Sequence, residues 1–441
     1  TFSEIVYPVW FATADGTISA DTINFFKNAN RTVDNYTTDG DTTYYAPDDS
    51  KFTELEYEAV GGIRITDIDD AVNYDFSKEV WLNMFECIRR YPSFGEVRSY
   101  IPSDEDPLFE RYDAMVDGYS RFWYVYEPES VQGETDVPVM FVLHGNGGGP
   151  SEITDQTGWK MLADELGIIL IAPQGSASWG TEMMSYAGVN YQQYTTTWTT
   201  SESETRPNDL EFIDYLMNWL TVDSEYAGQI DISRVYVTGQ SMGGNFTNSL
   251  IKYRPEYFAA AAPFSWIASP SDDADLSVDI PVVNGMGQRD GTIKGGFSSA
   301  NTMGDCKGMF EHFIDRYDLT EVGDLDRTYD DFTFMMEATD GTESICTSRD
   351  GGMNLYTFET EDGYPMFEAI EIIGMGHATI PTAVEHVWND IMSHYSRDVE
   401  TGVLYYDGEV VDTPTNLALV EDDDGGSAGG DTSKPSIRPG K

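Results

Sequence analysis

From about residue 116 onwards, the chain alternates apolar strand-forming runs with amphipathic helical runs. Runs such as VPVMFVLHG and IILIAPQG are apolar throughout, as expected for strands that are buried on both faces of a parallel sheet. Helical segments such as NDLEFIDYLMNWLTVDS and PTAVEHVWNDIMSHYS separate or follow such strands. This rhythm predicts an α/β fold with an open, mostly parallel, doubly wound sheet and helices on both faces.

Two other regions flank this α/β domain, which we place at residues 116–398. Residues 1–115 are polar and turn-rich, with short aromatic or β-branched runs, and predict a small β-rich N-terminal region. Within it, FSKEVWLNMFECIRRY has the apolar spacing of a helix. Residues 399–441 are acidic and rich in Gly and Ser, which predicts a C-terminal tail or linker.

The charge is strongly acidic, with 77 Asp and Glu against 25 Lys and Arg. Such a surface repels nucleic acids and anionic membranes, so no nucleic-acid partner is expected. It fits solubility or adaptation to a salty or crowded extracellular medium. No apolar run is long enough for a transmembrane segment. Because the chain starts at Thr1 without Met, we expect a secreted or cell-surface protein whose signal peptide has been removed.

Three cysteines, Cys87, Cys306 and Cys346, are too few for a disulfide framework. Their spacing resembles no zinc site, and no other motif predicts a metal or a cofactor. A bridge between Cys306 and Cys346 is one possibility that the sequence leaves open.

The segment DISRVYVTGQSMGGNFTNSL, residues 231–250, places Ser241 between a strand and a helix. A sharp strand-to-helix turn that exposes a serine needs small neighbours, because backbone packs against backbone there. Gly239, Gly243 and Gly244 meet that need, and the helix N-terminus favours negative charge near the serine. Ser241 is therefore a candidate nucleophile, although the motif alone is also compatible with an ordinary glycine-rich turn.

A serine nucleophile needs a base, and His377 is the best candidate among five histidines. It lies in GMGHATIP, at the carboxyl end of a strand, where sites form in a doubly wound sheet. Three other histidines lie in helical segments. Asp290 follows the strand IPVVNG in the same way and could orient the imidazole. The alternative for Asp290 is a plain turn residue, since the chain is rich in Asp beside Gly.

Residues 141–149, FVLHGNGGG, end a strand in a glycine-rich loop that can turn backbone N–H groups inward. A tetrahedral intermediate requires such donors around its oxyanion. We expect the N–H of Met242 as one donor and that of Asn146 or Gly147 as the second. His144 would brace the loop. The rival interpretation, a phosphate-binding loop, lacks the G-x-G-x-x-G spacing and the P-loop Lys.

Aromatic residues are the clearest clue to a substrate. Trp179 and Trp198 lie in residues 176–200, and Trp266 lies in PFSWIAS, each expected near the edge of the sheet that holds Ser241. Aromatic walls suit a phenolic acyl group, a sugar face or a polyester chain. A hydrophobic lid or a partner-contact patch is the alternative.

Together these motifs resemble the esterase branch of the α/β-hydrolase superfamily that includes polyhydroxybutyrate depolymerases and feruloyl or acetyl-xylan esterases. The resemblance rests on RFWYVYEP, VMFVLHGNGGG, ADELGIILIAPQG, NDLEFIDYL, ISRVYVTGQSMGG and GMGHATIP. It implies a serine esterase, without a cofactor, that acts on a small or polymeric ester through an acyl-enzyme. The triad order Ser241, Asp290, His377 is the one this fold uses.

The resemblance leaves three matters open. Residues 1–115 have no counterpart in a minimal esterase, and by analogy with longer members they could form an immunoglobulin-like domain. A serine peptidase on the same fold, or a non-catalytic surface-binding protein, remains an alternative function. The oligomeric state is not indicated by any motif.

Overall fold

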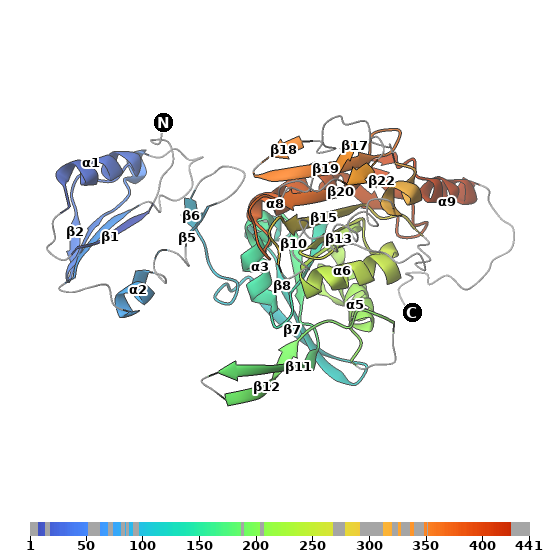
Figure 1. Cartoon of the computed structure of the whole chain (residues 1–441), viewed down its shortest axis with the longest axis horizontal. Helices are drawn as coiled ribbons and strands as arrows, with labels where there is room; N and C mark the ends of the chain where they lie inside the picture. The colour runs from blue at the N-terminus through green and yellow to red at the C-terminus, as the bar shows by residue number, and fades with distance from the viewer. Residues whose placement is uncertain are drawn as a thin grey trace. The chain divides into compact units, whose positions relative to one another are not determined.

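The chain forms two compact units, Thr1–Asp106 and Pro107–Lys441 (Figure 1). The structure is a computed structural model, and it describes residues 8–13, 18–51, 62–68, 74–80, 84, 88–90, 97–186, 189–202, 207–267, 278–291, 312–319, 325–327, 336–338, 348–350 and 352–424. Cys87, Cys306 and Cys346 lie outside these residues, so the structure does not test whether Cys306 and Cys346 are bridged.

The N-terminal unit is built on a four-stranded sheet in the order β1-β4-β3-β2. Its strands are β1 Val9–Thr13, β2 Thr37–Asp39, β3 Thr42–Tyr45 and β4 Ile63–Asp67. Helix α1 (Ala20–Ala29) begins at Ser19, whose hydroxyl accepts a hydrogen bond from the Thr22 N–H. The rings of Phe11 in β1 and Phe26 in α1 are 5.6 Å apart, so α1 packs against one face of this sheet.

This arrangement differs from the immunoglobulin-like alternative. An immunoglobulin-like domain packs two antiparallel sheets, whereas β1 and β4 are parallel neighbours in one mixed sheet with a helix against it. The expected helix is confirmed in part. Within FSKEVWLNMFECIRRY, helix α2 (Tyr74–Val80) includes the first residues and Met84 is also helical, whereas Ile88–Arg90 form β5, which pairs with β6 (Val97–Ser99).

The larger unit contains a ten-stranded sheet over the described residues. From one edge to the other, its strands are β18 Ser348–Asp350, β19 Met353–Glu359, β20 Pro365–Ile372, β15 Val282–Gly287, β14 Ala260–Phe264, β13 Ile230–Gln240, β9 Val137–Leu143, β10 Ile169–Pro173, β8 Tyr119–Tyr126 and β7 Phe109–Val116. The central strands from β20 to β10 are parallel, and the outer strands at both edges are antiparallel. The expected mostly parallel α/β sheet is confirmed.

Helices cover both faces of this sheet (Figure 1). Helices α3 (Pro150–Thr157), α4 (Trp159–Leu166) and α8 (Pro381–His386) form one group, since α4 contacts α8 and α3 contacts β9 and β10. Helices α5 (Asp209–Asn218) and α6 (Met242–Tyr253) lie on the other side. Every residue of β9 is buried, which explains its unbroken apolar sequence.

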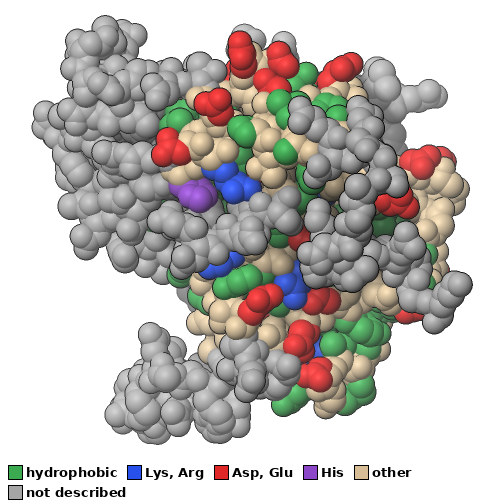
Figure 2. All heavy atoms as spheres, turned by 90° about the vertical axis from the view of Figure 1, so that its right-hand side faces the viewer, with side chains coloured by type: hydrophobic (Ala, Val, Ile, Leu, Met, Phe, Trp, Pro, Cys, Tyr) green, Lys and Arg blue, Asp and Glu red, His purple; other side chains and the backbone are tan. Residues whose placement is uncertain are grey.

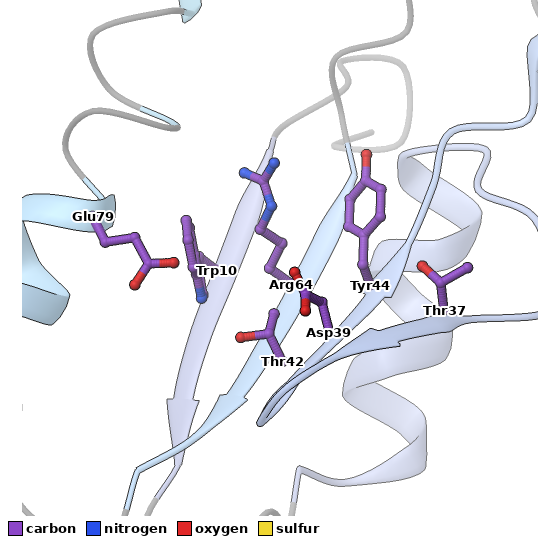
Figure 3. A pocket seen from close by; sticks show the side chains of 7 residues that line it. All are labelled: Trp10, Thr37, Asp39, Thr42, Tyr44, Arg64 and Glu79. Carbon is purple, nitrogen blue, oxygen red and sulfur yellow. The ribbon is translucent and has the colours of Figure 1, made fainter.

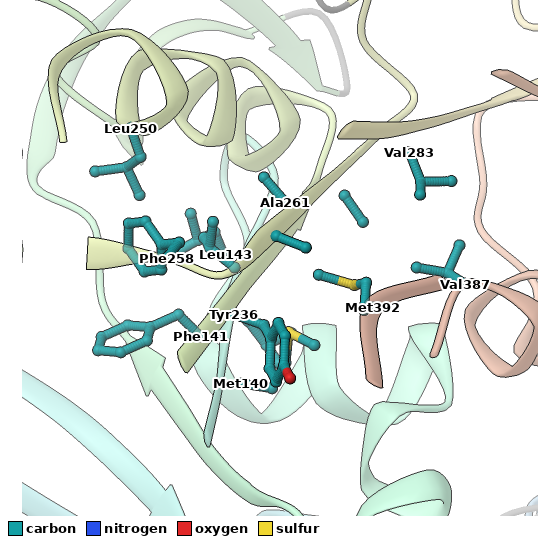
Figure 4. Close-up of a cluster of buried hydrophobic side chains, with 14 of the residues drawn as sticks. Met140, Phe141, Leu143, Tyr236, Leu250, Phe258, Ala261, Val283, Val387 and Met392 are labelled. Atoms are coloured by element: carbon teal, nitrogen blue, oxygen red, sulfur yellow. The ribbon is translucent and has the colours of Figure 1, made fainter. Parts of the chain in front are cut away.

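The core between sheet and helices combines large aromatic side chains with small ones such as Ala261 (Figure 4). Phe141 and Phe258 pack edge to face, with ring centroids 5.9 Å apart. Tyr236 is fully buried and donates a hydrogen bond to the Tyr395 carbonyl at 2.7 Å, which satisfies its hydroxyl inside the core. The strands that carry the site therefore rest on a rigid, well-packed base.

The boundaries of the larger unit differ from those expected from sequence. All of strand β7 except Val116 lies before the expected boundary, yet β7 pairs with β8 along its full length. Residues 404–424, expected in the tail, include β22 (Leu404–Tyr406), β23 (Glu409–Val410) and α9 (Pro414–Asp424). The buried Asn416 side chain accepts a hydrogen bond from the Leu404 N–H and donates one to the Leu404 carbonyl. These side-chain hydrogen bonds order the segment, and they produce no apolar periodicity in the sequence.

On the face shown in Figure 2, the acidic side chains of the described residues are scattered and do not form a single patch. Across the described residues, no helix combines the length and the apolar character that crossing a bilayer requires.

Candidate active site

Ser241 stands on a strained turn between β13 and α6. Its φ of 58° and ψ of −118° are unfavourable for a residue with a Cβ. The turn is held on both sides, because the Ser241 N–H donates to the Phe264 carbonyl at 2.9 Å and the Asn245 N–H donates to the Ser241 carbonyl at 2.9 Å. The surrounding backbone thus enforces the conformation that the sequence predicted for an exposed serine.

The three glycines around Ser241 are required by close backbone packing. A Cβ on Gly243 would lie 2.1 Å from the Leu143 carbonyl oxygen, and one on Gly244 would lie 2.4 Å from that of Phe264. A Cβ on Gly239 would lie 2.5 Å from the Gly243 backbone. The turn therefore touches β9 and β14 directly, and no larger residue fits at these positions.

His377 and Asp290 are joined by a hydrogen bond from Nδ1 to Oδ2 of 2.7 Å. The Asp290 side chain is fully buried and that of His377 is 24% exposed. A carboxylate only accepts, so Nδ1 carries the proton and Nε2 is left with a lone pair. An imidazole in this state can take a proton from a hydroxyl group and return it to a leaving group.

The two loops that carry Asp290 and His377 are tied together by backbone contacts. The Arg289 N–H donates to the Met375 carbonyl at 2.7 Å, and the Gln288 side chain accepts from the Gly374 N–H at 2.9 Å. A Cβ on Gly287 would lie 2.0 Å from the Gly376 carbonyl oxygen. The acid and the histidine are thus positioned by main chain as well as by their own hydrogen bond.

Ser241 and His377 line the same pocket, whose volume is about 280 Å³. The Gln240 amide, next to the serine, donates to the His377 carbonyl at 3.4 Å. The described residues that line the pocket are His144, Gly145, Asn146, Gly147, Gly148, Gly149, Glu152, Ile153, Gln156, Gln240, Ser241 and His377. The glycine-rich loop after β9 therefore faces the serine, as the sequence predicted.

The expected oxyanion donors do not all have a free N–H. The Gly147 N–H donates to the Thr196 carbonyl at 2.7 Å, with Gly147 at a φ of 77°. That bond takes up the donor and fixes the loop, so Gly147 is a structural glycine. Met242 is the first residue of α6, where a backbone N–H has no partner within the helix. The geometry leaves Met242 and Asn146 as the candidate donors.

His144 braces the loop after β9 through backbone bonds. Its Nε2 accepts from the Gly175 N–H at 2.9 Å, so the proton is on Nδ1, which donates to the Gly145 carbonyl at 2.7 Å. Burial lowers the pKa of His144, although the bond to Gly145 opposes that shift. A neutral, buried imidazole with both nitrogens engaged serves to position Gly145, which lies against Ser241.

A buried ion pair fixes the chain segments next to His144. Arg121 and Asp209 are paired, with side chains 5% and 0% exposed. Asp209 also accepts from the Ser176 hydroxyl at 2.9 Å and from the Thr199 N–H at 2.6 Å. The pair therefore holds the chain on either side of residues 177–198, and removing one partner would leave a buried charge.

The predicted aromatic wall is not formed by Trp198. That side chain is 4% exposed, stacks on Phe246 at 4.7 Å and donates to the His144 carbonyl at 2.7 Å. It is a core residue that supports the loop, because its ring and its N–H are both already engaged. Trp266 is partly buried and is not among the described lining residues. For Trp179, in β11 (Ala177–Tyr186), the side chain lies outside the described residues.

The sequence interpretation missed several polar residues around the site. Glu152 and Gln156 line the pocket from successive turns of α3 and are joined by a 2.8 Å hydrogen bond. Their i,i+4 spacing was a usable signal once the helix start was known. Gln174 directly follows β10 and its amide binds His144 Nε2 at 2.9 Å. Its place at a strand's carboxyl end could have identified it.

No group of three His, Cys, Asp or Glu side chains in the described part of the chain could hold a metal ion.

Several known proteins are similar to this chain. A bifunctional acetylxylan esterase/xylanase, XynS20E, of Neocallimastix patriciarum is 22% identical over 281 residues, which are 64% of this chain and 34% of the relative. Feruloyl esterase B of Thermothelomyces thermophilus is 32% identical over 149 residues, which are 33% of this chain and 44% of the relative. The chain thus spans less than half of the length of each of these two relatives.

A solved structure, the acetyl xylan esterase from Aspergillus awamori, aligns with 63% of this chain and 98% of its own, at 16% identity and a TM-score of 0.36. The Esterase family profile matches residues 118–342, just over half of the chain, including the Ser241 turn and the Asp290 loop. The chain therefore belongs to the Esterase family of α/β-hydrolases.

Proposed function

We propose that this chain hydrolyses carboxylic esters through an acyl-enzyme on Ser241. The observation that carries the proposal is the 2.7 Å bond between His377 Nδ1 and the buried Asp290 carboxylate, with His377 in the same pocket as the strained Ser241. Without a base oriented in this way, a serine hydroxyl is a poor nucleophile.

The proposed reaction has two half-steps. Ser241 Oγ attacks the ester carbonyl while His377 Nε2 takes the hydroxyl proton, and the N–H groups of Met242 and Asn146 stabilise the oxyanion. His377 then gives the proton to the leaving alcohol, which departs and leaves an acyl-serine. A water, deprotonated by His377, then adds to the acyl carbonyl, and His377 returns the proton to Ser241 Oγ as the bond to the serine breaks and the acid leaves. Asp290 stabilises the imidazolium that forms in each half-step.

The pocket lining favours an ester of a polyhydroxylated alcohol with a small acyl group. Among the described residues that line it, Ile153 is the one aliphatic side chain, while Asn146, Glu152, Gln156 and Gln240 are polar. A volume of about 280 Å³ is small for a ligand site. An acetylated plant polysaccharide fits these features better than a polyester chain. A polymer of this kind would be met outside the cell, so we further propose that the protein is secreted.

The glutamate at the pocket rim adds a charge preference. Glu152 lies near the backbone of the glycine loop, with Oε2 3.4 Å from the position of a Cβ on Gly148. A carboxylate at this place repels an anionic substrate and accepts hydrogen bonds from sugar hydroxyls. A neutral acetylated sugar therefore suits the site better than a substrate with a carboxylate close to the ester.

A substrate panel tests the proposal. The chain and its Ser241→Ala variant would be assayed on a short chromogenic ester, acetylated xylan, methyl ferulate, polyhydroxybutyrate and a chromogenic peptide. We expect ester turnover that the variant loses, with acetylated xylan preferred to methyl ferulate. Equal turnover by the two proteins would refute the Ser241 mechanism. Cleavage of the peptide alone would favour a peptidase, and a preference for methyl ferulate would replace the acetyl substrate by a feruloyl one.

A further inference from the structure

The N-terminal unit carries a second pocket on the sheet face opposite α1. Strand pairing places Trp10, Arg64, Tyr44 and Thr37 side by side in one row across all four strands. Because side chains alternate between faces along a strand, this row points away from the face that holds Phe11 and α1. A face that carries Trp, Arg, Tyr and Thr has the composition of a binding surface more than of a core.

The Arg64 guanidinium lies between the two aromatic rings of this row (Figure 3). Its guanidinium carbon is 4.9 Å from the Trp10 ring and 5.2 Å from the Tyr44 ring. Such stacking fixes a long side chain that would otherwise lose conformational entropy when a ligand binds. The guanidinium is thus held in place before any ligand arrives.

A threonine pair fixes the Trp10 ring in turn. The Trp10 indole N–H donates to the Thr66 hydroxyl at 2.8 Å, and the hydroxyls of Thr66 and Thr42 are 2.8 Å apart. The same ring meets Phe76 of α2 edge to face, at 5.8 Å. The aromatic part of the pocket is therefore built by contacts from β1, β3, β4 and α2.

The pocket has a volume of about 290 Å³ and a mixed set of polar groups. Besides Arg64, it is lined by the carboxylates of Asp39 and Glu79 and by the hydroxyls of Thr37 and Thr42 (Figure 3). Arg64 can only donate hydrogen bonds, the carboxylates only accept them, and the threonines do both. A ligand that satisfies this set must itself offer donors and acceptors close together.

From these features we propose that the pocket binds a neutral sugar unit, such as the end of a glycan chain. Each sugar hydroxyl both donates and accepts, and the C–H face of the ring packs against aromatic side chains. An anionic ligand is disfavoured by two carboxylates against one guanidinium, in a chain of net charge −52. The volume suits one or two sugar units better than a folded partner.

This proposal is independent of the ester chemistry and is tested by binding. The Ser241→Ala chain would be titrated calorimetrically with xylotriose, cellotriose, mannotriose and, as the anionic probe, trigalacturonate. We expect saturable binding of at least one neutral trisaccharide. The variants Asp39→Asn and Arg64→Met should weaken it about 10-fold or more, because each loses a charge-assisted hydrogen bond.

The control is Arg111→Met, which removes another arginine that stacks on a strand aromatic, with its guanidinium carbon 4.2 Å from the Phe122 ring. It should leave sugar binding unchanged. Asp39 is exposed at the end of β2, so Asp39→Asn decides the matter even where Arg64→Met fails to fold. In a chain that keeps Ser241, the Asp39→Asn variant should hydrolyse the short ester at the same rate as the unchanged chain. No binding of any neutral sugar, binding equal in both Asp39 forms, or binding of trigalacturonate alone would overturn the proposal.

Discussion

Two glycine-rich loops of the larger unit each carry a histidine after a parallel strand, and the two histidines have different surroundings. His144 follows β9 and is 1% exposed, with Nδ1 on a backbone carbonyl and Nε2 on a backbone N–H. His377 follows β20, and its Nδ1 binds the Asp290 carboxylate. The sequence context of the two residues is alike, and the partner of Nδ1 distinguishes them.

The difference shows how a fold assigns a role to an imidazole. A backbone carbonyl gives little stabilisation to a charged ring, and burial disfavours it, so His144 stays neutral and acts as a brace. A buried carboxylate stabilises the imidazolium that a proton transfer creates, so His377 can act as a base. Substitutions that change these partners test the comparison.

The largest expected effect is that of Asp290→Asn. An amide presents N–H to Nδ1 and forces the imidazole into the other tautomer, so we expect kcat on a short ester to fall about 10⁴-fold. Because the change is isosteric, the thermal transition should move little. The measurement is steady-state kinetics from pH 6 to pH 10 beside circular dichroism. A fall of less than about 10-fold would show that His377 works without this carboxylate.

Gly243→Ala should have the next largest effect, through stability. A Cβ there would lie 2.1 Å from the Leu143 carbonyl oxygen, so β9 and the Ser241 turn must separate. We expect a loss of about 3 kcal/mol in the free energy of unfolding, together with loss of esterase activity. Gly376→Ala, in the His377 loop, is the matched control, because a Cβ there would meet nothing within 4 Å. Equal losses in urea unfolding would contradict this account of the turn.

His144→Leu should separate bracing from catalysis. The variant leaves the buried Gly175 N–H without its acceptor, so we expect a loss of about 2 kcal/mol in the free energy of unfolding. Since Gly145 and the loop beside Ser241 shift but the triad remains, kcat should fall by about 10- to 100-fold. Urea unfolding and ester kinetics measure the two effects. A fall in kcat as large as that of Asp290→Asn would mean that His144 itself takes part in the chemistry.

The sequence predicted the central sheet, and it singled out Asp290 and His377 as candidate partners of Ser241, because both inferences rest on local patterns. Unbroken apolar runs such as β9 mark buried strands, and residues at strand ends such as Asp290 and His377 meet at one edge. The sequence could not show that the Gly147 N–H is already bonded, because its partner is the carbonyl of Thr196, about fifty residues later. Trp198 was misplaced for a similar reason, since tertiary stacking on Phe246 decides its direction.

The boundaries of the larger unit escaped prediction because long-range pairing and polar bonds set them. Between its buried ends, Phe109 and Val116, strand β7 has only exposed and partly buried residues, so it lacks the unbroken apolar run of the central strands, and its place in the sheet is set by pairing with β8. At the other end, Asn416 joins Leu404 and Val411 through its amide, which no apolar period reveals. Hydrophobic patterning identifies elements whose own sequence carries the apolar residues that face the core. It does not identify segments that are ordered by hydrogen bonds to distant residues.

A third histidine, His386 of α8, extends the comparison to an imidazole between two carboxylates. Its Nε2 is 2.7 Å from Glu368, which is 2% exposed, and its Nδ1 is 2.5 Å from Asp390, which is 63% exposed. Burial lowers the pKa of His386, but the bonds and charges of Glu368 and Asp390 outweigh it, so the net shift is upward. The folded state therefore holds this proton more tightly than the unfolded chain does.

The smallest predicted effect follows from the upward shift of the His386 pKa. Stability from a raised histidine pKa is fully present below the unfolded value, about 6.5, and is lost as the pH rises through the folded value. His386→Gln should therefore cost on the order of 1–2 kcal/mol in urea unfolding at pH 5.5 and less at pH 9. High salt should remove only part of the difference, because Asp390 is exposed and screened whereas Glu368 is buried. A cost that is the same at both pH values would show that His386, like His144, serves as a neutral hydrogen-bonding group.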